Sequence, residues 1–559
     1  MDIAVNKRES NYLKQYLSER KWALGFAIFI MVVTTVPYFW GYCAENREIQ
    51  NSWRFTGFIF GVEDGNSYIA KALTGMAGAW LFRTPYTAIQ QKGVIAFLPY
   101  LLFGKLAAPP GTHEQLVALF QLFRFFAGVL MVLATYDFIK YFVNDERMSR
   151  YGTVIAIIGG GIGWLLLLFG KSTILDSLPL EFYSPEAFGF LSLYGIPHLA
   201  MARALLLWGL LCHFKLSSSI NIARYLEPVF IGLIWLLVAL LQPLTAMVMG
   251  MVLAIYPVIV IIQNTKTIKP LQILNKNKIR NQLKIFLLEL LPPLPFFIYY
   301  FISATTDEFL KAWSAQNIIS SPHPLHYLLA YFLLLPFSFV GIYISLKNKQ
   351  TQYYVLFCWL ILSFVLAYSP FTIQRRLIDG IWVVLVIFML EGYRWVRNVH
   401  PKQIFGYYLP IISMLVTPSA LILLVGGVIT AAHPAEPVFL PAAEIGAFEF
   451  INSYAQSGDI VIAAYDTGNA LPAWAPVRVL LGHGPESADF DYFKQLIDRF
   501  YNRNWNDSDR LEIIDKFRIR FVFWGPKEQR LGDWNPAEAA WLTKVFDYDG
   551  YTVYEVLYP

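Results

Sequence analysis

The fold class is decided by residues 22–40, WALGFAIFIMVVTTVPYFW, a stretch without a charged residue. A helix needs about 20 mostly apolar residues to cross a bilayer, so this stretch predicts a membrane-spanning helix. A signal peptide is the alternative, because a basic head precedes the stretch. However, the head and the apolar stretch are both longer than is usual in signal peptides, and Cys43-Ala-Glu is a poor cleavage site. We therefore predict a cytoplasmic segment 1–21 and a retained first helix.

The composition of the whole chain agrees with a membrane protein. Of 559 residues, 56% are hydrophobic and 15% are charged, and the mean hydropathy is +0.47. Soluble proteins carry about 25% charged residues. This balance excludes a disordered chain, a fibrous chain, a coiled coil and a small disulfide scaffold. The cysteines, Cys43, Cys212 and Cys358, lie far apart and form no CxxC pair, so the sequence predicts neither a disulfide framework nor a zinc site.

Similar apolar stretches recur along the chain, and we expect about 11 spans in all. The others lie at 116–141, 152–170, 195–214, 228–242, 244–262, 284–302, 326–346, 352–369, 377–393 and 406–430. The stretch 92–108 is short and broken by Pro99, so we expect a re-entrant or interfacial helix there. With the N-terminus inside, basic residues fall in cytoplasmic loops, as the positive-inside rule requires. The densest basic run, from Lys266 to Lys284, is expected to contact anionic lipid headgroups.

The C-terminal part of the chain differs in charge from the rest. From Glu436 onward the net charge is −8, whereas the remainder carries +13. Strands are expected near 460–463, 477–481, 521–523 and 551–557, and helices at 441–456, 486–501 and 508–517. An odd number of spans places this part outside. We predict a mainly α fold, a polytopic transmembrane helical bundle over 22–432 with an extracytoplasmic α/β domain at 433–559, and external loops at 41–115, 171–195, 303–325 and 369–377.

Polar residues near the external ends of spans are candidates for a site. The first are Glu63 and Asp64, in the first external loop. A carboxylate there can remove a proton from an acceptor hydroxyl, as a general base does. The alternative is a solvated Asp-Gly turn.

Two further segments carry candidates in later external loops. Glu186, Tyr194, His198 and Arg203 lie in or after the loop 171–195, where the alternative is a wet loop with a Pro-His helix start. Gln374-Arg375-Arg376 places an Arg pair outside, against the positive-inside trend. The planar guanidinium is suited to phosphate, and interfacial snorkelling is the alternative.

In this order, the segments resemble the GT-C superfamily of polytopic membrane glycosyltransferases, in particular its bacterial mannosyltransferase-like members. The resemblance is one of layout over residues 20–430. Glu63-Asp64 stands at the place of the family's first-loop acid, and Gln374-Arg375-Arg376 resembles a late-loop Arg element. The segment from Tyr194 to His198 resembles a Pro-His element at the outer end of a span.

Two more segments add to the resemblance. Thr84-Pro85-Tyr86, followed by 92–108, looks like the family's loop helices. In the tail, Leu481 to Ser487, LGHGPES, with Lys494 downstream, is similar to a Gly-His…Glu-Thr segment of some bacterial members. Here Ser487 replaces the Thr.

The resemblance implies transfer of a sugar from a polyprenyl-phosphate-linked donor to a lipid, glycan or protein acceptor. The reaction would take place on the outer face of a bacterial plasma membrane and invert the anomeric centre. Besides donor and acceptor, membrane lipids are expected as partners, and nucleic acid is not. No metal ligand is assigned, and a divalent metal is left open.

The resemblance also implies roles for individual residues. Asp64 would be the catalytic base, with Glu63 in support. Donor phosphate would be bound by Arg375, Arg376, His198 and Arg203. Substrate contacts are expected from Tyr68, Tyr194, Glu186 and Gln374.

Two other classes of function fit a polytopic chain. A transporter or lipid flippase predicts internal repeats and charges near mid-span, whereas the candidate charges here sit at external ends of spans. A non-catalytic scaffold predicts that loss of Asp64 or Arg375 leaves function intact. The run Gly159-Gly160-Gly161-Ile-Gly163 lies inside an apolar stretch, so we interpret it as close helix packing within the span 152–170 and not as a dinucleotide motif.

Overall fold

The computed structural model describes residues 19–45, 52–218, 226–265, 272–348, 351–400 and 406–558. The chain divides into two compact units. Unit 1 comprises Met1–Thr35, Phe123–Ile298 and Ile319–Val425. Unit 2 comprises Val36–Leu122, Tyr299–Ile318 and Gly426–Pro559, and thus contains the predicted C-terminal domain together with two earlier segments.

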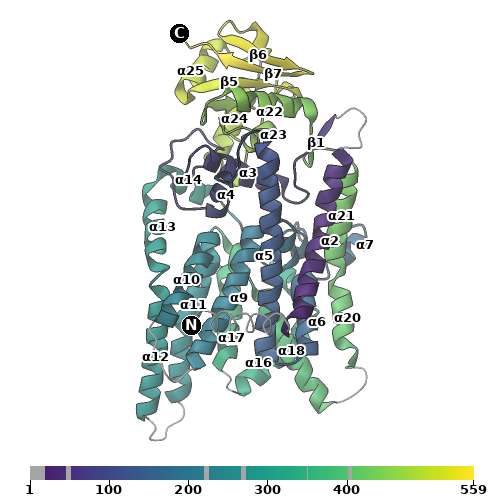
Figure 1. Ribbon diagram of the computed structural model, residues 1–559, viewed down its shortest axis with the longest axis vertical. Coiled ribbons are helices and arrows are strands. Elements are labelled where there is room, and N and C mark those ends of the chain that lie inside the picture. The colour runs from purple at the N-terminus through teal and green to yellow at the C-terminus, as the bar shows by residue number, and fades with distance from the viewer. Residues whose placement is uncertain are drawn as a thin grey trace, which may run out of the picture. The chain divides into compact units, whose positions relative to one another are not determined.

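The apolar stretches of the sequence form helices (Figure 1). Helices α2, α5, α13 and α21 contribute residues to both units. The helices and 3-10 turns that lie wholly or partly in unit 1 are α2 (Lys21–Glu45), α5 (Thr112–Val143), α6 (Glu146–Ile158), α7 (Trp164–Leu168), η1 (Leu180–Phe182), α8 (Phe190–Gly195), α9 (Pro197–Ser218), α10 (Leu226–Leu241), α11 (Pro243–Thr265), α12 (Gln272–Leu290), α13 (Leu294–Thr306), α15 (Pro324–Tyr331), α16 (Leu335–Lys347), α17 (Thr351–Ala367), η2 (Gln374–Ile378), α18 (Ile381–Val399), α20 (Tyr408–Val416) and α21 (Pro418–Ala432).

Helix α18 is buried within unit 1. It is apolar on every side from Ile381 to Leu390, and all of these residues are buried. A helix of this kind must be covered all round. Its partner α16 comes close because both helices have a glycine at the crossing. A Cβ at Gly341 would meet the carbonyl oxygen of Phe388, and one at Gly392 would meet that of Phe337.

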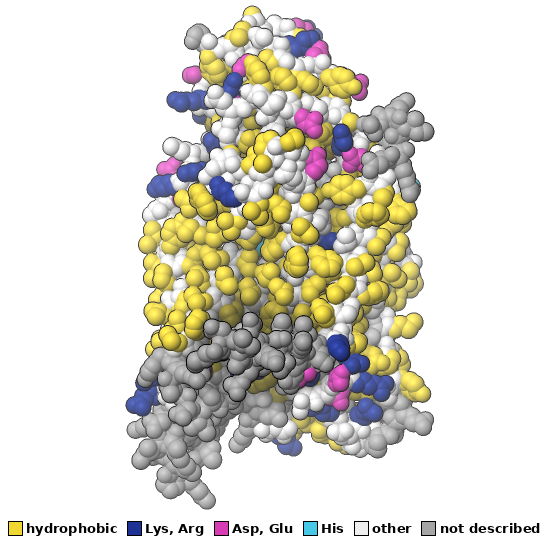
Figure 2. Space-filling model, in the orientation of Figure 1, with side chains coloured by type: hydrophobic (Ala, Val, Ile, Leu, Met, Phe, Trp, Pro, Cys, Tyr) yellow, Lys and Arg dark blue, Asp and Glu magenta, His cyan; other side chains and the backbone are white. Residues whose placement is uncertain are grey.

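The outer surface of the helices is apolar. Exposed side chains include Phe29 on α2, Phe230 on α10 and Leu421 on α21, and Figure 2 shows hydrophobic side chains gathered over the helical region. Soluble proteins rarely expose so much apolar surface. Among the described residues, four helices are long and apolar enough to cross a membrane, or up to six if each bent pair counts as one. The chain is thus an integral membrane protein.

The predicted spans at 22–40, 116–141, 195–214 and 406–430 fall on these four candidates. The predicted spans 284–302 and 326–346 do not form straight helices. The first is bent by 54° between α12 and α13, and the second by 88° between α15 and α16. Prolines at and just after the breaks remove helical N–H donors and explain both bends. The total number of spans stays a prediction.

The predicted span 152–170 is wrong as a continuous helix. Helix α6 ends at Ile158, and α7 begins only at Trp164. Between them the glycine run meets the loop residue Glu181, whose carboxylate accepts a hydrogen bond from Gly163 N at 2.6 Å. A Cβ at Gly160 or Gly161 would collide with neighbouring residues. The glycines thus allow close approach to Ser419 of α21 and Ala330 of α15, as the packing interpretation expects, but they do so from a loop and not from within a span.

Two further expectations concern short segments. Over the predicted re-entrant stretch 92–108, only α4 (Leu98–Gly104) is helical, and it is too short to cross a bilayer. The basic run from Lys266 to Lys278 falls outside the residues whose side chains the structure describes, so the expected lipid contact there stays a prediction.

Unit 2 contains a five-stranded sheet and a two-stranded one. Its elements, besides those already given, are β1 (Trp53–Phe55), α3 (Val62–Met76), α14 (Glu308–Gln316), β2 (Phe439–Pro441), α22 (Ala442–Tyr454), β3 (Ile460–Ile462), α23 (Tyr465–Ala470), η3 (Leu471–Ala473), β4 (Arg478–Val479), η4 (Gly484–Glu486), α24 (Phe490–Phe500), α25 (Asp507–Phe517), β5 (Ile519–Trp524), α26 (Pro526–Gln529), η5 (Pro536–Glu538), β6 (Leu542–Tyr548) and β7 (Tyr551–Val556).

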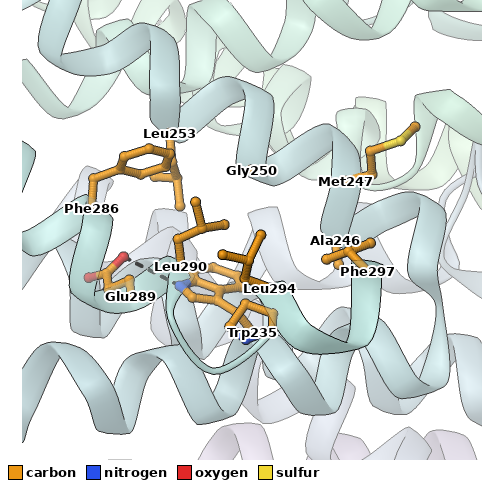
Figure 3. Close-up of a pocket in the computed structure, with 11 residues that line it drawn as sticks. Trp235, Ala246, Met247, Gly250, Leu253, Phe286, Glu289, Leu290, Leu294 and Phe297 are labelled. Carbon is orange, nitrogen blue, oxygen red and sulfur yellow. Dashed lines mark hydrogen bonds between the residues drawn. The ribbon is translucent and has the colours of Figure 1, made fainter. Parts of the chain in front are cut away.

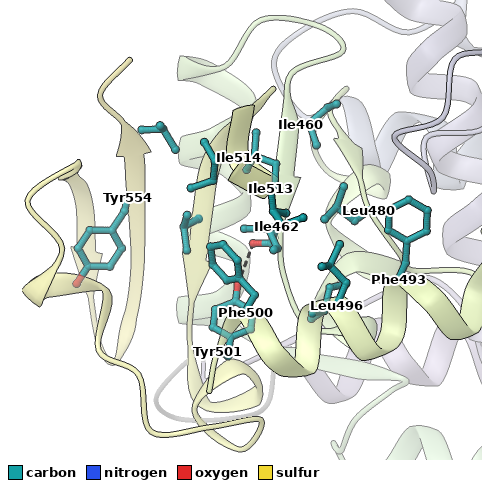
Figure 4. Packing of buried hydrophobic residues seen from close by; sticks show 14 of the residues in the cluster. Ile460, Ile462, Leu480, Phe493, Leu496, Phe500, Tyr501, Ile513, Ile514 and Tyr554 are labelled. Carbon is teal, nitrogen blue, oxygen red and sulfur yellow. Dashed lines mark hydrogen bonds between the residues drawn. The ribbon is translucent and has the colours of Figure 1, made fainter. Parts of the chain in front are cut away.

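The five-stranded sheet has the order β4-β3-β5-β7-β6. Strand β3 is parallel to β4 and β5, and the other pairs are antiparallel. Successive side chains of β5 point to opposite faces, as in any strand. Val522 joins the buried cluster with α24 and α25 (Figure 4), whereas Phe523 packs against Phe448 of α22. Helices therefore cover both faces, and the predicted α/β fold is confirmed.

The two-stranded sheet joins distant parts of the sequence. Strand β1, in the first predicted external loop, pairs antiparallel with β2, just after the last apolar helix. Trp53 lies opposite Pro441, and Phe55 lies opposite Phe439. This pairing ties the segment that leads into α3 to the start of the tail.

Candidate functional site

Glu63 and Asp64 lie in the first turn of α3. Gly61 precedes them in the left-handed conformation, with φ 60°, which glycine adopts without strain. Acidic side chains are favourable at a helix N-terminus, where backbone N–H groups are exposed. Both carboxylates are exposed, and the side chain of Asp64 is 54% accessible. The alternative of a simple Asp-Gly turn is wrong, because the segment begins a helix.

His483 is the residue that the structure places beside Asp64. Its Nε2 lies 3.2 Å from Asp64 Oδ1, although the two residues are 419 positions apart. The imidazole is 4% exposed. The hydroxyl of Ser487 accepts hydrogen bonds from the backbone N–H groups of Gly482 and His483, both at 3.2 Å. The LGHGPES segment thus folds back on itself and fixes the histidine.

Behind His483 lies a buried cluster that we call the Lys71–Glu486 cluster. It comprises Lys71 and Ser67 of α3, Thr84 and Glu486. The Glu486 carboxylate accepts hydrogen bonds from Lys71 Nζ at 2.5 Å, Ser67 Oγ at 2.8 Å and Thr84 Oγ1 at 2.9 Å. Lys71 is wholly buried, and Glu486 Oε1 lies 3.7 Å from His483 Nδ1. The cluster therefore connects α3 to the tail through charged groups.

The charges of this cluster act on the pKa of Glu486. Burial alone would raise that pKa, because the interior disfavours a carboxylate. The charges of Lys71 and His483 outweigh burial, and the pKa of Glu486 lies below its ordinary value. The carboxylate is thus ionised at neutral pH.

The other residues of unit 2 that the sequence singled out mostly pack against protein groups. Tyr68 is buried and stacks on Tyr100, with ring centroids 4.5 Å apart. Thr84 and Tyr86, noted in the sequence, both reach the tail, and the Tyr86 hydroxyl donates to the carbonyl of Asn469 at 3.1 Å. Lys494 is exposed on α24.

Arg203 is too deeply buried to bind the donor phosphate, as the sequence predicted it would. It is 2% exposed, and it donates hydrogen bonds to Asp379 and to the carbonyls of Phe188 and Pro185. Each of its three nitrogens has a partner inside the protein. Asp379 in turn accepts from Thr245 at 2.7 Å. These bonds correct the predicted role: Arg203 holds the loop before α9 to the start of α18.

The Arg pair of η2 is more accessible. Arg376 Nε lies 3.8 Å from Glu186 Oε1, and its side chain is 39% exposed. The Arg375 guanidinium lies over the ring of Tyr183, 4.7 Å from its centroid. The Gln374 amide accepts from Ser321 N and donates to the carbonyl of Ser369, and so shapes this turn. The structure therefore brings together Glu186 and Arg376 of the predicted set.

Two more predicted residues of unit 1 lie in α8 and α9. Tyr194 is buried in α8, with its ring stacked on Phe190. His198 is half-buried in the first turn of α9. The predicted site residues thus divide between the units. Glu63, Asp64 and Tyr68 belong to unit 2, and the remainder belong to unit 1.

Unit 1 also contains an apolar cavity of about 260 Å³, lined by α10, α11, α12 and α13 (Figure 3). Glu289 is the single charged residue in this lining. Its carboxylate is held by His213 Nδ1 at 3.0 Å and by Trp235 Nε1 at 3.4 Å. Because the Glu289 carboxylate is already hydrogen-bonded, the other side chains that line the cavity present an apolar surface that suits a hydrocarbon chain.

No metal site is formed by the residues that the structure describes. Within those ranges, no group of three or more His, Cys, Asp or Glu side chains could hold a metal ion. Asp64 and His483 supply two such groups, but the oxygens of Glu486 are engaged by Lys71, Ser67 and Thr84. These residues do not fit a divalent cation, so we derive no step through one.

The sequence patterns of the two segments do not indicate the contact between Asp64 and His483. Lys71 was missed too. The sequence does indicate that Lys71 is paired, because a lysine inside the apolar stretch Ile69 to Leu73 must find a buried partner. Nothing local to either segment indicates which distant residue that partner is.

Comparison with known proteins gives a likeness of fold. No protein-family model matches the sequence, and no curated protein matches it. ArnT from Cupriavidus metallidurans, solved with undecaprenyl phosphate, superposes with a TM-score of 0.51 at 11% identity, over 95% of this chain and 98% of ArnT. The mycobacterial arabinofuranosyltransferase AftD superposes with a TM-score of 0.50 at 10% identity, over 96% of this chain and 40% of AftD.

Both are GT-C glycosyltransferases, which are membrane enzymes. The likeness to ArnT extends over nearly the full length of both chains. The chain thus has the GT-C fold of polytopic membrane glycosyltransferases.

Proposed function

We propose that the chain is a membrane glycosyltransferase. It transfers a sugar from a polyprenyl-phosphate-linked donor to a hydroxyl of a lipid, glycan or protein acceptor. The observation that carries the proposal is an accessible carboxylate, Asp64, held beside a buried histidine in a chain with the GT-C fold. The undecaprenyl phosphate in the ArnT structure supports the class of donor.

The chemistry is a single displacement at the anomeric carbon. Asp64 accepts the proton of the acceptor hydroxyl as the new oxygen–carbon bond forms. The bond between the anomeric carbon and the donor phosphate oxygen breaks, and the polyprenyl phosphate leaves with the bonding electrons. Attack from the opposite side inverts the anomeric centre. Glu63, exposed one residue earlier, adds a second negative charge beside Asp64 and so supports its role as base.

The donor is assigned to residues of unit 1. Arg376 and Arg375 bind the phosphate and stabilise the charge that it gains on leaving. His198 completes this group, Gln374 contacts the substrate, and Arg203 positions the surrounding loops. The apolar cavity of Figure 3 accommodates part of the donor's hydrocarbon chain.

We also propose an orientation. The N-terminus lies in the cytoplasm, and the C-terminal domain 433–559 lies on the outer face of a bacterial plasma membrane. The basic loops of the sequence support this orientation through the positive-inside rule. The acidic tail, with a net charge of −8 from Glu436 onward, disfavours broad docking of an anionic acceptor on it.

The proposal is tested by sugar transfer in vesicles that contain the purified chain. Labelled polyprenyl-phosphate sugars are supplied with a crude pool of lipid and glycan acceptors. We expect transfer with one donor class and a loss of about 100-fold or more for Asp64→Asn, because the base is removed while the shape is kept. Asp491→Asn, at an exposed position of α24, should match the wild type.

Three results would contradict parts of this proposal. Undiminished transfer by a folded Asp64→Asn variant would exclude Asp64 as the base, and Glu63→Gln would then be measured. Transfer from a nucleotide-linked sugar alone would exclude the lipid-linked donor. Movement of lipid across the vesicle membrane, without transfer of any donor sugar, would favour the flippase alternative.

A further inference from the structure

We propose that unit 2 binds an anionic group of the acceptor, a phosphate or a carboxylate, in the cavity that Arg83 and Arg478 line. This group lies away from the hydroxyl that receives the sugar. The inference rests on the proposed function, because it names a chemical property of the acceptor in that reaction.

The cavity has a volume of about 550 Å³ and is formed by segments that are far apart in the sequence. The end of α3 and the loop that follows it contribute one part of the lining, and residues 457–458 and 476–478 of the tail contribute the rest. The N–H of Val479 donates to the carbonyl of Pro85 at 2.8 Å and so fixes the two parts to each other. The lining that these described residues form contains two arginines and no Asp or Glu.

Backbone carbonyls hold both guanidinium groups in place. Arg478 donates from Nε and Nη2 to the carbonyls of Thr87 and Ile89, at distances of 2.6–3.1 Å. Arg83 donates from Nε and Nη2 to the carbonyls of residues 91–92, at 3.3 and 3.0 Å. Within the described part of the chain, Nη1 of each arginine has no hydrogen-bond partner. Each guanidinium thus keeps an N–H edge for a ligand.

The two positive charges at this cavity are not compensated. Neither Arg83 nor Arg478 forms an ion pair with any residue in the described ranges. Burial lowers the pKa of Arg478, and the charge of Arg83 lowers it further, so the two cations repel each other. Asp459 follows the lining in the sequence, but its carboxylate pairs with Arg520 at 2.6 Å. An oxyanion between the two arginines would remove this repulsion and accept hydrogen bonds from both.

A purely structural role explains the hydrogen bonds of the two arginines but not their charges. A neutral glutamine amide can also donate to backbone carbonyls, and it adds no repulsion. The end of α3 lies at the cavity too, and a helix C-terminus disfavours anions. Its last carbonyls, however, accept hydrogen bonds from the N–H groups of Ala77, Gly78 and Ala79. The two full positive charges therefore decide the sign of the potential in the cavity.

The position of the cavity on α3 indicates which part of the acceptor it can bind. Asp64 lies in the first turn of this helix, whereas Thr74 and Ala77 lie at its other end. At 1.5 Å per residue, about 15–20 Å separates them along the helix axis. The reacting hydroxyl and the bound anion are thus different groups of one acceptor. A contact so far from the reacting atoms is made equally in the ground state and in the transition state.

The first test is the binding of three sugars to the purified chain in detergent, measured by titration calorimetry. Glucose 6-phosphate carries a phosphate, methyl glucuronide carries a carboxylate, and glucose is the neutral control. We expect at least one anionic sugar to bind, and glucose not to bind. Arg83→Gln and Arg478→Gln should each weaken this binding about tenfold, because a charge-assisted hydrogen bond is lost. Arg503→Gln, at an exposed position of the same unit, should match the wild type.

The second test is sugar transfer in vesicles, with the acceptor pool separated by ion exchange into anionic and neutral fractions. Arg83 is exposed, so its replacement leaves the interior of unit 2 unchanged. We expect Arg83→Gln to raise the KM for the anionic fraction about tenfold and to leave kcat unchanged, as for a contact made equally in both states. A fall in kcat without any change in KM would contradict this role.

Three binding results would overturn the inference. The first is that no sugar binds to the wild type, and the second is that glucose binds as tightly as the anionic sugars. The third is undiminished binding of the anionic sugar by a folded variant that combines Arg83→Gln and Arg478→Gln, which would place the anion elsewhere. Failure of the proposed function is a separate result, in which the chain binds an anionic sugar through these arginines but transfers no donor sugar.

Discussion

Glu444 and Glu486 are both buried carboxyl groups of unit 2, yet their pKa values shift in opposite directions. Glu486 is surrounded by donors and by Lys71, and its pKa is lowered. Burial raises the pKa of Glu444 to about 7, even though Lys527 Nζ lies 2.8 Å away. Lys527 also pairs with Glu436 at 3.0 Å, so one ammonium serves two carboxylates. Local pairing therefore decides which carboxyl is held as an anion.

This difference predicts a pH dependence of stability. A carboxyl whose pKa is raised on folding adds stability below its ordinary pKa, and this stability is lost as the pH rises through the folded value. For Glu444 the window runs from about pH 4.5 to about 7, and the loss approaches about 3 kcal/mol. We expect Glu444→Gln to flatten this decline in thermal unfolding of the detergent-solubilised chain. An unchanged slope in the variant would show that another group titrates.

Arg376 gives a second prediction for a single residue. A phosphate contact that strengthens as the leaving group gains charge should affect kcat more than KM. We expect Arg376→Gln to lower kcat about tenfold. Arg397→Gln, exposed near the end of α18, is the matched control. A rise in the KM for the donor at constant kcat would instead show that Arg376 contacts the bound donor and the transition state equally.

The crossing of α16 and α18 requires a glycine on each helix. Gly341→Ala or Gly392→Ala would place a Cβ against a backbone carbonyl, which cannot turn aside as a side chain can. We expect each to destabilise the chain by about 1–3 kcal/mol and to lower the yield of folded protein. Gly25→Ala on α2 meets nothing within 4 Å and should be harmless. Equal melting temperatures for all three variants would mean that the helices can separate without cost.

The elements that could be predicted are those with a strong local signal. Apolar length gave α2, α5 and α9, and short β-branched or aromatic runs bounded by turns gave the positions of β3 and β5. Strand β6, LTKVFDY, was missed because it is half exposed and carries charges. The bends after α12 and α15 were missed because hydrophobicity continues through them, although prolines mark both breaks.

The orientation of the whole chain in the membrane decides on which side sugar transfer takes place. We expect Asp491→Cys, in the tail, to react with a membrane-impermeant maleimide from outside intact cells. Lys347→Cys, at the exposed end of α16, should react only after the membrane is opened. The experiment is done in a background without the three native cysteines. The reverse pattern would place the C-terminal domain in the cytoplasm and contradict the proposed donor side.

The candidate site could be predicted only in pieces. Asp64 and the LGHGPES segment were each recognised, but no local pattern states that they meet. Their contact depends on how α3 packs against the tail, through Lys71 and Glu486 in the interior of unit 2. Pairing of this kind is a property of the complete fold, since each half is an ordinary polar segment when considered alone.

Asp64 and His483 are far apart in the sequence, so the ribosome makes them at different times. The ribosome makes the carboxylate first and the imidazole 419 residues later. At about 5–20 residues per second, the interval is roughly 20–80 s. Throughout synthesis of the helical bundle, Asp64 lacks the histidine beside it and Lys71 lacks its anion. A nascent chain is thus already anchored in the membrane before the group around Asp64 is complete.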